Sequence, residues 1–208
     1  MDKKYWKNYY EKQVAPIEAS LFAQFVLEKY IQEGDSLLEL GCGNGRDSIF
    51  FANNGVGVVA VDQCENEIFV LSNEQQLSNL KFLTGDFTKL EDLGKFNHIY
   101  SRFTLHSITE QEESDTIKWA YEHLENGGVL LIEARGKMNE LYKLGDPVPG
   151  EPDAYVYEGH YRRFSDIEIL CKKLSETGFK IVSAEEKSGF APFDATDYVF
   201  MRVVASKN

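Results

Sequence analysis

The chain has 208 residues, 34 of them acidic against 22 Lys and Arg, and its formal net charge is −12. That length predicts one domain, residues 1–208, with a substantial core, and the acidic balance disfavours a non-specific nucleic-acid binder. No apolar run approaches the roughly 18 residues that span a bilayer, and the three cysteines, Cys42, Cys64 and Cys171, are too scattered to predict a zinc site or a disulfide framework. We therefore expect a cytoplasmic protein with reduced thiols, no metal and no membrane attachment.

The first half of the chain alternates helical patterns with short runs of β-forming residues. Residues 5–31 have a helical distribution of aromatic and aliphatic side chains, which Pro16 divides in two. After Gly34 the pattern predicts, in order, a strand over 36–40, a helix over 46–52, a strand over 58–62, a helix over 65–78 and a strand over 81–84.

The second half continues this alternation. A strand over 96–101 precedes a helix that begins at the capping box Thr109-x-x-Glu112 and runs to about 124, and a strand over 129–134 follows. A second capping box, Ser165-x-x-Glu168, begins a helix that ends near Gly178. Two final strands, over about 179–185 and 197–205, form a hairpin. The order predicts an α/β sheet with crossover helices.

Residues 136–164 are expected to form a long irregular loop. The segment contains three prolines and is rich in aromatic and basic side chains, which is unusual for a plain linker. Long loops inside compact domains are often functional, so we expect this segment to cover an acceptor.

A glycine loop, Gly41-Cys42-Gly43-Asn44-Gly45, lies between a predicted buried strand and a helix. Glycines let the backbone turn tightly and approach a ligand closely. Asp62 ends the next strand, where an acid can accept hydrogen bonds from ribose hydroxyls. The third glycine of a dinucleotide-binding loop is replaced by Arg46, and Glu39 precedes the loop. A carboxylate there repels pyrophosphate but suits an amino group, such as that of S-adenosylmethionine.

Residues 36–135 resemble class I S-adenosylmethionine-dependent methyltransferases. The matching segments, in the family's order, are LLELGCGNG (37–45), VVAVD (58–62), GDF (85–87), IYSRF (99–103) and GGVLLIEA (127–134). The resemblance implies a doubly wound, seven-stranded, mostly parallel sheet with a reversed last strand, a Rossmann-like methyltransferase fold. Gly45-Arg46-Asp47 is loosely similar to tellurite-resistance-type members of this fold.

The resemblance also implies a cofactor site for S-adenosylmethionine and its product S-adenosylhomocysteine. Glu39 and the loop backbone would lie near the methionine end. Asp62 would hold the ribose, Gln63 would lie beside the adenine, and Ser101 would lie beneath the sulfonium. Arg46 would either reach the methionine carboxylate or form an ion pair with Asp47 at the start of its helix. The complete set of predicted cofactor-binding residues is Glu39, Gly41, Cys42, Gly43, Arg46, Asp62, Gln63, Asp86, Phe87 and Ser101.

His106 is the candidate catalytic base, since it follows the fourth strand, where this fold places the acceptor pocket. Histidine titrates near neutral pH and can accept a proton from a hydroxyl acceptor. Two alternatives stay open, namely that His106 contacts the acceptor without catalysing the reaction, or that it only supports the loop.

Basic residues gather on predicted loops and strand ends despite the overall acidity, and guanidinium groups match phosphate and carboxylate. We therefore expect a small anionic acceptor, such as a phosphorylated, carboxylated or sugar-nucleotide-like metabolite. The alternative is that these arginines pair with nearby acids such as Glu133 or Asp153. The predicted acceptor-binding residues are Tyr9, Arg102, His106, Arg135, Tyr161, Arg162 and Arg163.

Residues 1–33 are expected to form a helical lid, with the aromatics around Tyr9 either shielding the reaction or simply packing on the sheet. Modification of a protein or RNA is a second hypothesis for the function, and a non-catalytic regulatory or scaffold protein that binds the cofactor is a third. No two prolines are adjacent, so the tetrad of base-amino DNA methyltransferases is absent. An oligomer is compatible with the sequence.

Overall fold

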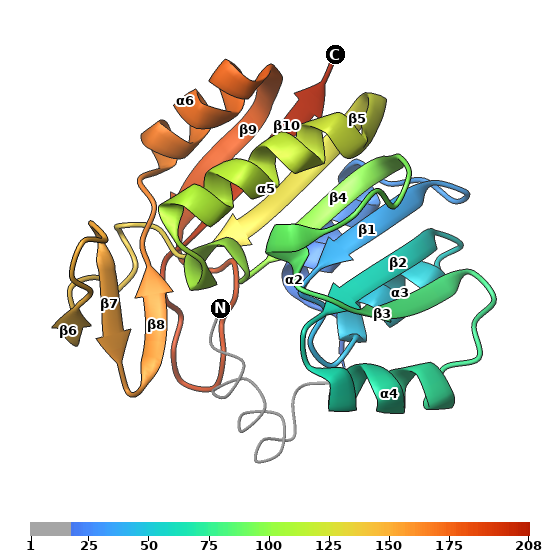
Figure 1. Cartoon of the computed structure of the whole chain (residues 1–208), viewed down its shortest axis with the longest axis horizontal. Helices are drawn as coiled ribbons and strands as arrows, with labels where there is room; N and C mark the ends of the chain where they lie inside the picture. Colours follow the sequence, from blue (N-terminus) through green and yellow to red (C-terminus); the bar gives the residue numbers. More distant parts are fainter. Residues whose placement is uncertain (1–17) are drawn as a thin grey trace.

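The computed structural model describes residues 18–208, and its centre is a seven-stranded sheet (Figure 1). The strand order is β3-β2-β1-β4-β5-β10-β9, and only β10 runs against its neighbours. This confirms the predicted doubly wound sheet with a reversed last strand. The strands are β1 (Ser36–Leu40), β2 (Gly57–Asp62), β3 (Leu80–Thr84), β4 (Phe96–Arg102), β5 (Leu124–Ala134), β9 (Phe179–Lys187) and β10 (Phe200–Lys207).

Helices cover both faces of the sheet, so its central strands are apolar on both sides. Tyr100 of β4 is wholly buried against one group of helices, and Ile99 beside it is wholly buried against the other. The first face carries α2 (Leu21–Lys29), α3 (Arg46–Asn53) and α4 (Glu65–Glu74), and the second carries α5 (Glu110–His123) and α6 (Ile167–Thr177). Two short 3₁₀ helices, η1 (Phe87–Lys89) and η2 (Leu105–Ser107), follow β3 and β4.

The expectation of an irregular loop over 136–164 is wrong. The segment holds a small antiparallel sheet of β6 (Asp146–Pro147), β7 (Ala154–Tyr157) and β8 (His160–Arg163), which lies beside the carboxyl end of β5 (Figure 1). Glu158 and Gly159, with φ of 53° and 71°, form the two-residue turn between β7 and β8. Two positive φ values in a row are typical of the type I′ hairpin turn.

Two helix boundaries also differ from expectation. Helix α4 ends at Glu74, four residues before the predicted end. The N-cap of α6 is Asp166, whose carboxylate accepts from the backbone N–H groups of Glu168 and Ile169. Ser165 does not cap this helix, because its hydroxyl donates to the buried carboxylate of Glu113 at 3.0 Å. The predicted lid falls mostly on residues 1–17, which lie outside the described part of the chain.

Candidate active site

A cavity of about 660 Å³ opens where the carboxyl ends of β1, β2, β4 and β5 meet. Ligands of doubly wound sheets bind at this edge. The cavity has two halves. One is built from the glycine loop and the ends of β1 and β2, and the other from the ends of β4 and β5, strand β8 and the loop before β10. One space therefore joins the predicted cofactor residues to predicted acceptor residues.

The glycine loop needs its glycines for two separate reasons. Gly41, Gly43 and Gly45 have φ of 75°, 54° and 72°, a conformation that side chains with a Cβ rarely adopt. A Cβ at Gly41 would also stand 2.4 Å from Cγ2 of Thr104, which follows β4. The loop thus turns sharply while lying directly against the end of the neighbouring strand.

Asp62 is anchored by the backbone on both sides of its carboxylate. The N–H of Gly43 donates to Oδ2 at 2.9 Å, and the N–H of Cys64 donates to Oδ1 at 2.8 Å. Each carboxylate oxygen accepts more than one hydrogen bond, so the side chain is oriented without being saturated. Asp62 and Gln63 both border the cavity, and this arrangement fits the grip on a ribose diol that the sequence predicts.

Glu39 is a buried carboxyl group at the start of the glycine loop. It is only 4% exposed, borders the cavity, and accepts a short hydrogen bond from the hydroxyl of Ser48. Burial, with a contribution from the nearby Asp47, raises the pKa of Glu39 to about 8. Glu39 is therefore largely protonated at pH 7 in the free protein, and a cation in the cavity would favour its ionised form.

Asp47 ties α2 to α3 and to the sheet. Its carboxylate accepts from the N–H and the hydroxyl of Ser20, both at 2.7 Å, and from the hydroxyl of Tyr100 at 2.8 Å. Nε of Arg46 lies 4.0 Å from the same carboxylate, and Nη1 donates to the carbonyl of Glu18 at 3.3 Å. The alternative of a helix-start ion pair is thus present, although Arg46 also borders the cavity.

Arg102 brings a partly neutralised guanidinium group to the second half of the cavity. Its Nε donates at 2.9 Å to Glu133, a fully buried carboxylate whose other oxygen accepts from Arg202 at 2.7 Å. The pairing with Glu133 is one that the sequence left open. No hydrogen bond joins the two Nη groups of Arg102 to residues 18–208, and this side chain borders the cavity.

Aromatic side chains that were not predicted from the sequence form the wall of the cavity beside Arg102 and Arg135. Phe103 has φ of 59°, unusual for a bulky residue, and its ring stacks on that of Phe200 with centroids 4.7 Å apart. The guanidinium of Arg102 lies 4.0 Å from the Phe103 ring centroid, and that of Arg135 lies 4.8 Å from the Phe200 centroid. Phe193, 56% exposed, borders the same half.

Strand β8 separates the predicted acceptor residues into two sets. Of the predicted residues on this strand, Arg162 borders the cavity whereas Tyr161 and Arg163 do not, and His160, which was not predicted, borders it as well. Successive side chains of a strand point to opposite sides, so β8 divides neighbouring residues in a way that an irregular loop would not. The hydroxyl of Tyr161 donates instead to Glu151 at 2.6 Å.

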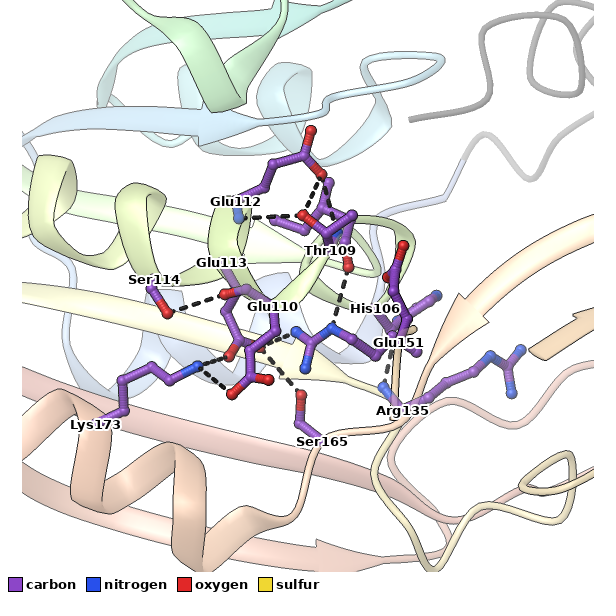
Figure 2. A network of polar contacts seen from close by, with 12 residues as sticks. His106, Thr109, Glu110, Glu112, Glu113, Ser114, Arg135, Glu151, Ser165 and Lys173 are labelled. Carbon is purple, nitrogen blue, oxygen red and sulfur yellow. Dashed lines mark hydrogen bonds and ion pairs between the residues drawn. The ribbon is translucent and has the colours of Figure 1, made fainter. Parts of the chain in front are cut away.

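Arg163 belongs to a buried ion network centred on Glu113 of α5. Its guanidinium donates to Glu113 and, through Nε, to the carbonyl of Ile108 at 3.1 Å. Ser165 and Lys173 donate to the same carboxylate at 3.0 and 2.7 Å (Figure 2). The network joins the small sheet to α5 and α6, so Arg163 holds the wall of the cavity and does not line it.

His106 borders the cavity and is almost wholly buried, with 4% of its surface exposed. Its Nδ1 accepts a hydrogen bond of 3.3 Å from the backbone N–H of Arg135 (Figure 2). Burial, reinforced by the positive charge of Arg135 and of residues on β8, holds the pKa of His106 well below its usual range. The imidazole is therefore neutral at pH 7.

Three predicted cofactor residues do not border the cavity. The hydroxyl of Ser101 is hydrogen-bonded to that of Thr104 at 2.6 Å, and Asp86 caps η1 by accepting from the N–H and hydroxyl of Thr88. Phe87 packs in the core beneath the glycine loop. Tyr9 lies outside the described residues. Within residues 18–208, no cluster of side chains could hold a metal ion and no helix is long and apolar enough to cross a membrane.

Comparisons with known proteins find a methyltransferase family model and relatives named as methyltransferases. A family model described as a methyltransferase domain matches residues 9–184. Phosphoethanolamine N-methyltransferase 3 of Arabidopsis thaliana is 29% identical over 170 residues, 79% of this chain and 33% of that protein. A relative from Geobacillus sp. (strain WCH70) is 29% identical over 149 residues, 67% of this chain and 59% of that protein. The chain thus spans less than two thirds of the length of either relative.

Solved structures share the fold at lower sequence identity. TehB from Haemophilus influenzae aligns with a TM-score of 0.69 and 19% identity over 99% of this chain and 67% of its own. The 1,6-didemethyltoxoflavin-N1-methyltransferase of Burkholderia thailandensis, solved with 1,6-didemethyltoxoflavin and S-adenosylhomocysteine, aligns with a TM-score of 0.70 and 18% identity over 99% and 84%. At these identities the likeness concerns the fold alone.

Proposed function

Since this chain belongs to the class I S-adenosylmethionine-dependent methyltransferases, we propose that it methylates an oxygen or nitrogen atom of a small anionic metabolite. The observation that carries this proposal is the single cavity that joins the cofactor residues to three arginines and two histidines. Those five residues are Arg102, Arg135, Arg162, His106 and His160. Phosphorylated, carboxylated and sugar-nucleotide-like molecules are the acceptors that such a cavity suits.

The cofactor half of the cavity fits a nucleoside with an amino-acid tail. Asp62 offers an oriented carboxylate to a diol, and the bare backbone around Gly43 admits close approach. Glu39 lies at the same end of β1 with a carboxyl group that a nearby ammonium ion would ionise. We propose that Glu39 meets the methionine amino group and that Arg46 serves its carboxylate. The assignments of Ser101, Asp86 and Phe87 receive no support from the cavity.

The acceptor half supplies positioning more than chemistry. S-adenosylmethionine, when bound, would supply an activated methyl group to a lone pair of the acceptor. The chain must therefore hold the acceptor at attack distance and exclude water. The guanidinium groups of Arg102 and Arg135, backed by the rings of Phe103 and Phe200, form a wall that can hold an anion.

Two other functions remain hypotheses. A protein or RNA methyltransferase would present an open groove for a chain, whereas the buried positions of His106 and His160 favour a small molecule. A non-catalytic scaffold would bind the cofactor and transfer nothing. The proposal includes a cytoplasmic location, because no disulfide joins any of the three cysteines in residues 18–208.

Calorimetry and label transfer test these functions separately. Titration with S-adenosylmethionine and S-adenosylhomocysteine should show binding that Asp62→Asn weakens and that Asp115→Asn, a matched change at an exposed carboxylate, leaves unchanged. The protein is then incubated with methyl-labelled cofactor and, in parallel, a small-molecule extract, a protein fraction and an RNA fraction. Label in the small-molecule fraction supports the proposal, label in another fraction supports the alternatives, and binding without transfer supports a scaffold.

A further inference from the structure

We propose that His106 donates a hydrogen bond from Nε2 to an anionic oxygen of the acceptor and does not serve as the base that deprotonates it. This inference rests on the proposed function and narrows its substrate class. The two ring nitrogens of His106 have different surroundings: one faces the backbone of Arg135, and the other has no hydrogen-bond partner among the described residues.

The backbone determines which nitrogen holds the proton. The N–H of Arg135 donates to Nδ1 of His106 at 3.3 Å, and a backbone amide can only donate. Nδ1 must therefore present its lone pair. A neutral imidazole has one protonated nitrogen, so the proton resides on Nε2. Protonation of both nitrogens would set two N–H groups against each other, which is unfavourable.

The surroundings of His106 also oppose a second proton. Arg135 approaches from the end of β5, and His160, Arg162 and Arg163 approach from β8. These groups are cationic or can become so, and the ring itself is buried. No carboxylate is hydrogen-bonded to His106 within residues 18–208, whereas the histidine of a hydrolase triad has an acid that stabilises its charged form.

A general base would need a lone pair directed at the acceptor, and the Nε2–H group offers a proton instead. The group of the acceptor that meets His106 must therefore bring the lone pair. Arg102 and Arg162 border the same half of the cavity, so the complementary group is an oxyanion, a carboxylate or phosphate oxygen. An acceptor of this class requires no proton removal at that contact.

Nitrogen-15 NMR of the free protein tests the tautomer directly. Long-range ¹H–¹⁵N spectra at pH 7, with the His106 signals assigned by their loss in His106→Asn, should show Nδ1 unprotonated and Nε2 protonated. A proton on Nδ1, or on both nitrogens, would overturn the proposal. This readout needs neither cofactor nor acceptor, so it stands even if no methyl transfer is found.

Two conservative variants then separate donor from base. Gln places an amide N–H group near the position of Nε2. Asn places an oxygen near that of Nδ1, where it can accept from Arg135, but its amide N–H groups stop short of the position of Nε2. With labelled cofactor and the small-molecule extract, a donor role predicts that His106→Gln keeps at least about a tenth of the transfer rate while His106→Asn loses about a hundredfold.

Equal losses of about 10²–10⁴-fold in both variants would indicate a base, and unchanged transfer in both would show that His106 does not meet the acceptor. Either result overturns the proposal. Affinity for S-adenosylhomocysteine should stay within about twofold in both variants, which confirms that they fold. Absence of transfer in the natural protein would refute the proposed function, while the NMR measurement would still decide the tautomer.

Discussion

Replacing Glu39 by Gln should abolish a proton release that accompanies cofactor binding. The carboxyl group of Glu39 is buried beside Asp47 and has its pKa raised to about 8. At pH 7 that pKa leaves roughly a tenth of the molecules ionised, and ionising the rest costs about 1.4 kcal/mol. If the methionine ammonium group requires the carboxylate, binding at pH 7 should release about 0.9 proton.

The raised pKa of Glu39 determines how cofactor affinity changes with pH. Affinity should rise about tenfold between pH 6 and pH 7, because each unit below the pKa reduces the ionised fraction of Glu39 tenfold. Glu39→Gln cannot ionise, so its affinity should match that of the natural protein near pH 6 and fall behind it as the pH increases.

Titration calorimetry measures both quantities. The heat of cofactor binding at pH 7, compared in phosphate and Tris, gives the number of protons released, and Asp115→Asn serves as a control at an exposed site. Equal proton release in the natural protein and Glu39→Gln would refute the reasoning. A second check uses the free protein. Because the pKa of the Glu39 carboxyl group is raised in the folded state, the free energy of unfolding should fall as the pH rises from about 4.5 to about 8. Glu39→Gln should remove that part of the decline in melting temperature.

Four further substitutions test cofactor binding, acceptor methylation and the frame of the site. Asp62→Asn should weaken S-adenosylhomocysteine binding by about 10- to 100-fold, the loss of charged hydrogen bonds worth about 1.5–3 kcal/mol; a change below twofold in calorimetry would contradict the ribose assignment. Arg163→Gln should lower the free energy of unfolding in urea by about 3–5 kcal/mol, since it breaks the buried pair with Glu113. Arg162→Gln, at the neighbouring position, should reduce label transfer with little change in the urea midpoint. If Arg162→Gln and Arg163→Gln destabilised the protein equally, the two side chains would not lie on opposite sides of β8 as described. Asp47→Ala should cost about 3 kcal/mol in the same assay by leaving buried donors on α2 and β4 without their acceptor, and an unchanged midpoint would show that this tie is dispensable.

The sequence was sufficient to predict the sheet and to place the glycine loop and Asp62 at one edge of it, although Ser101, Asp86 and Phe87 do not border the cavity there. Strands buried on both faces appear in the sequence as continuous apolar runs. A glycine loop after one strand and an acid, Asp62, at the end of the next strand together indicate a nucleoside-binding edge of the sheet. The β7–β8 hairpin was harder to predict, because Gly159 suits the second position of a type I′ turn whereas Glu158 is not one of the residues that favour the first. The neighbouring prolines obscured it.

The acceptor half was decided by tertiary structure. The sequence placed Arg162 and Arg163 together, but a strand directs one to the cavity and the other to a carboxylate fifty residues away in the chain. The role of His106 depends on the backbone N–H of Arg135, which belongs to another strand. A sequence specifies which groups can donate or accept, whereas their partners are assigned only when distant segments are brought within about 3 Å, and that distance is set by the packing of the whole sheet.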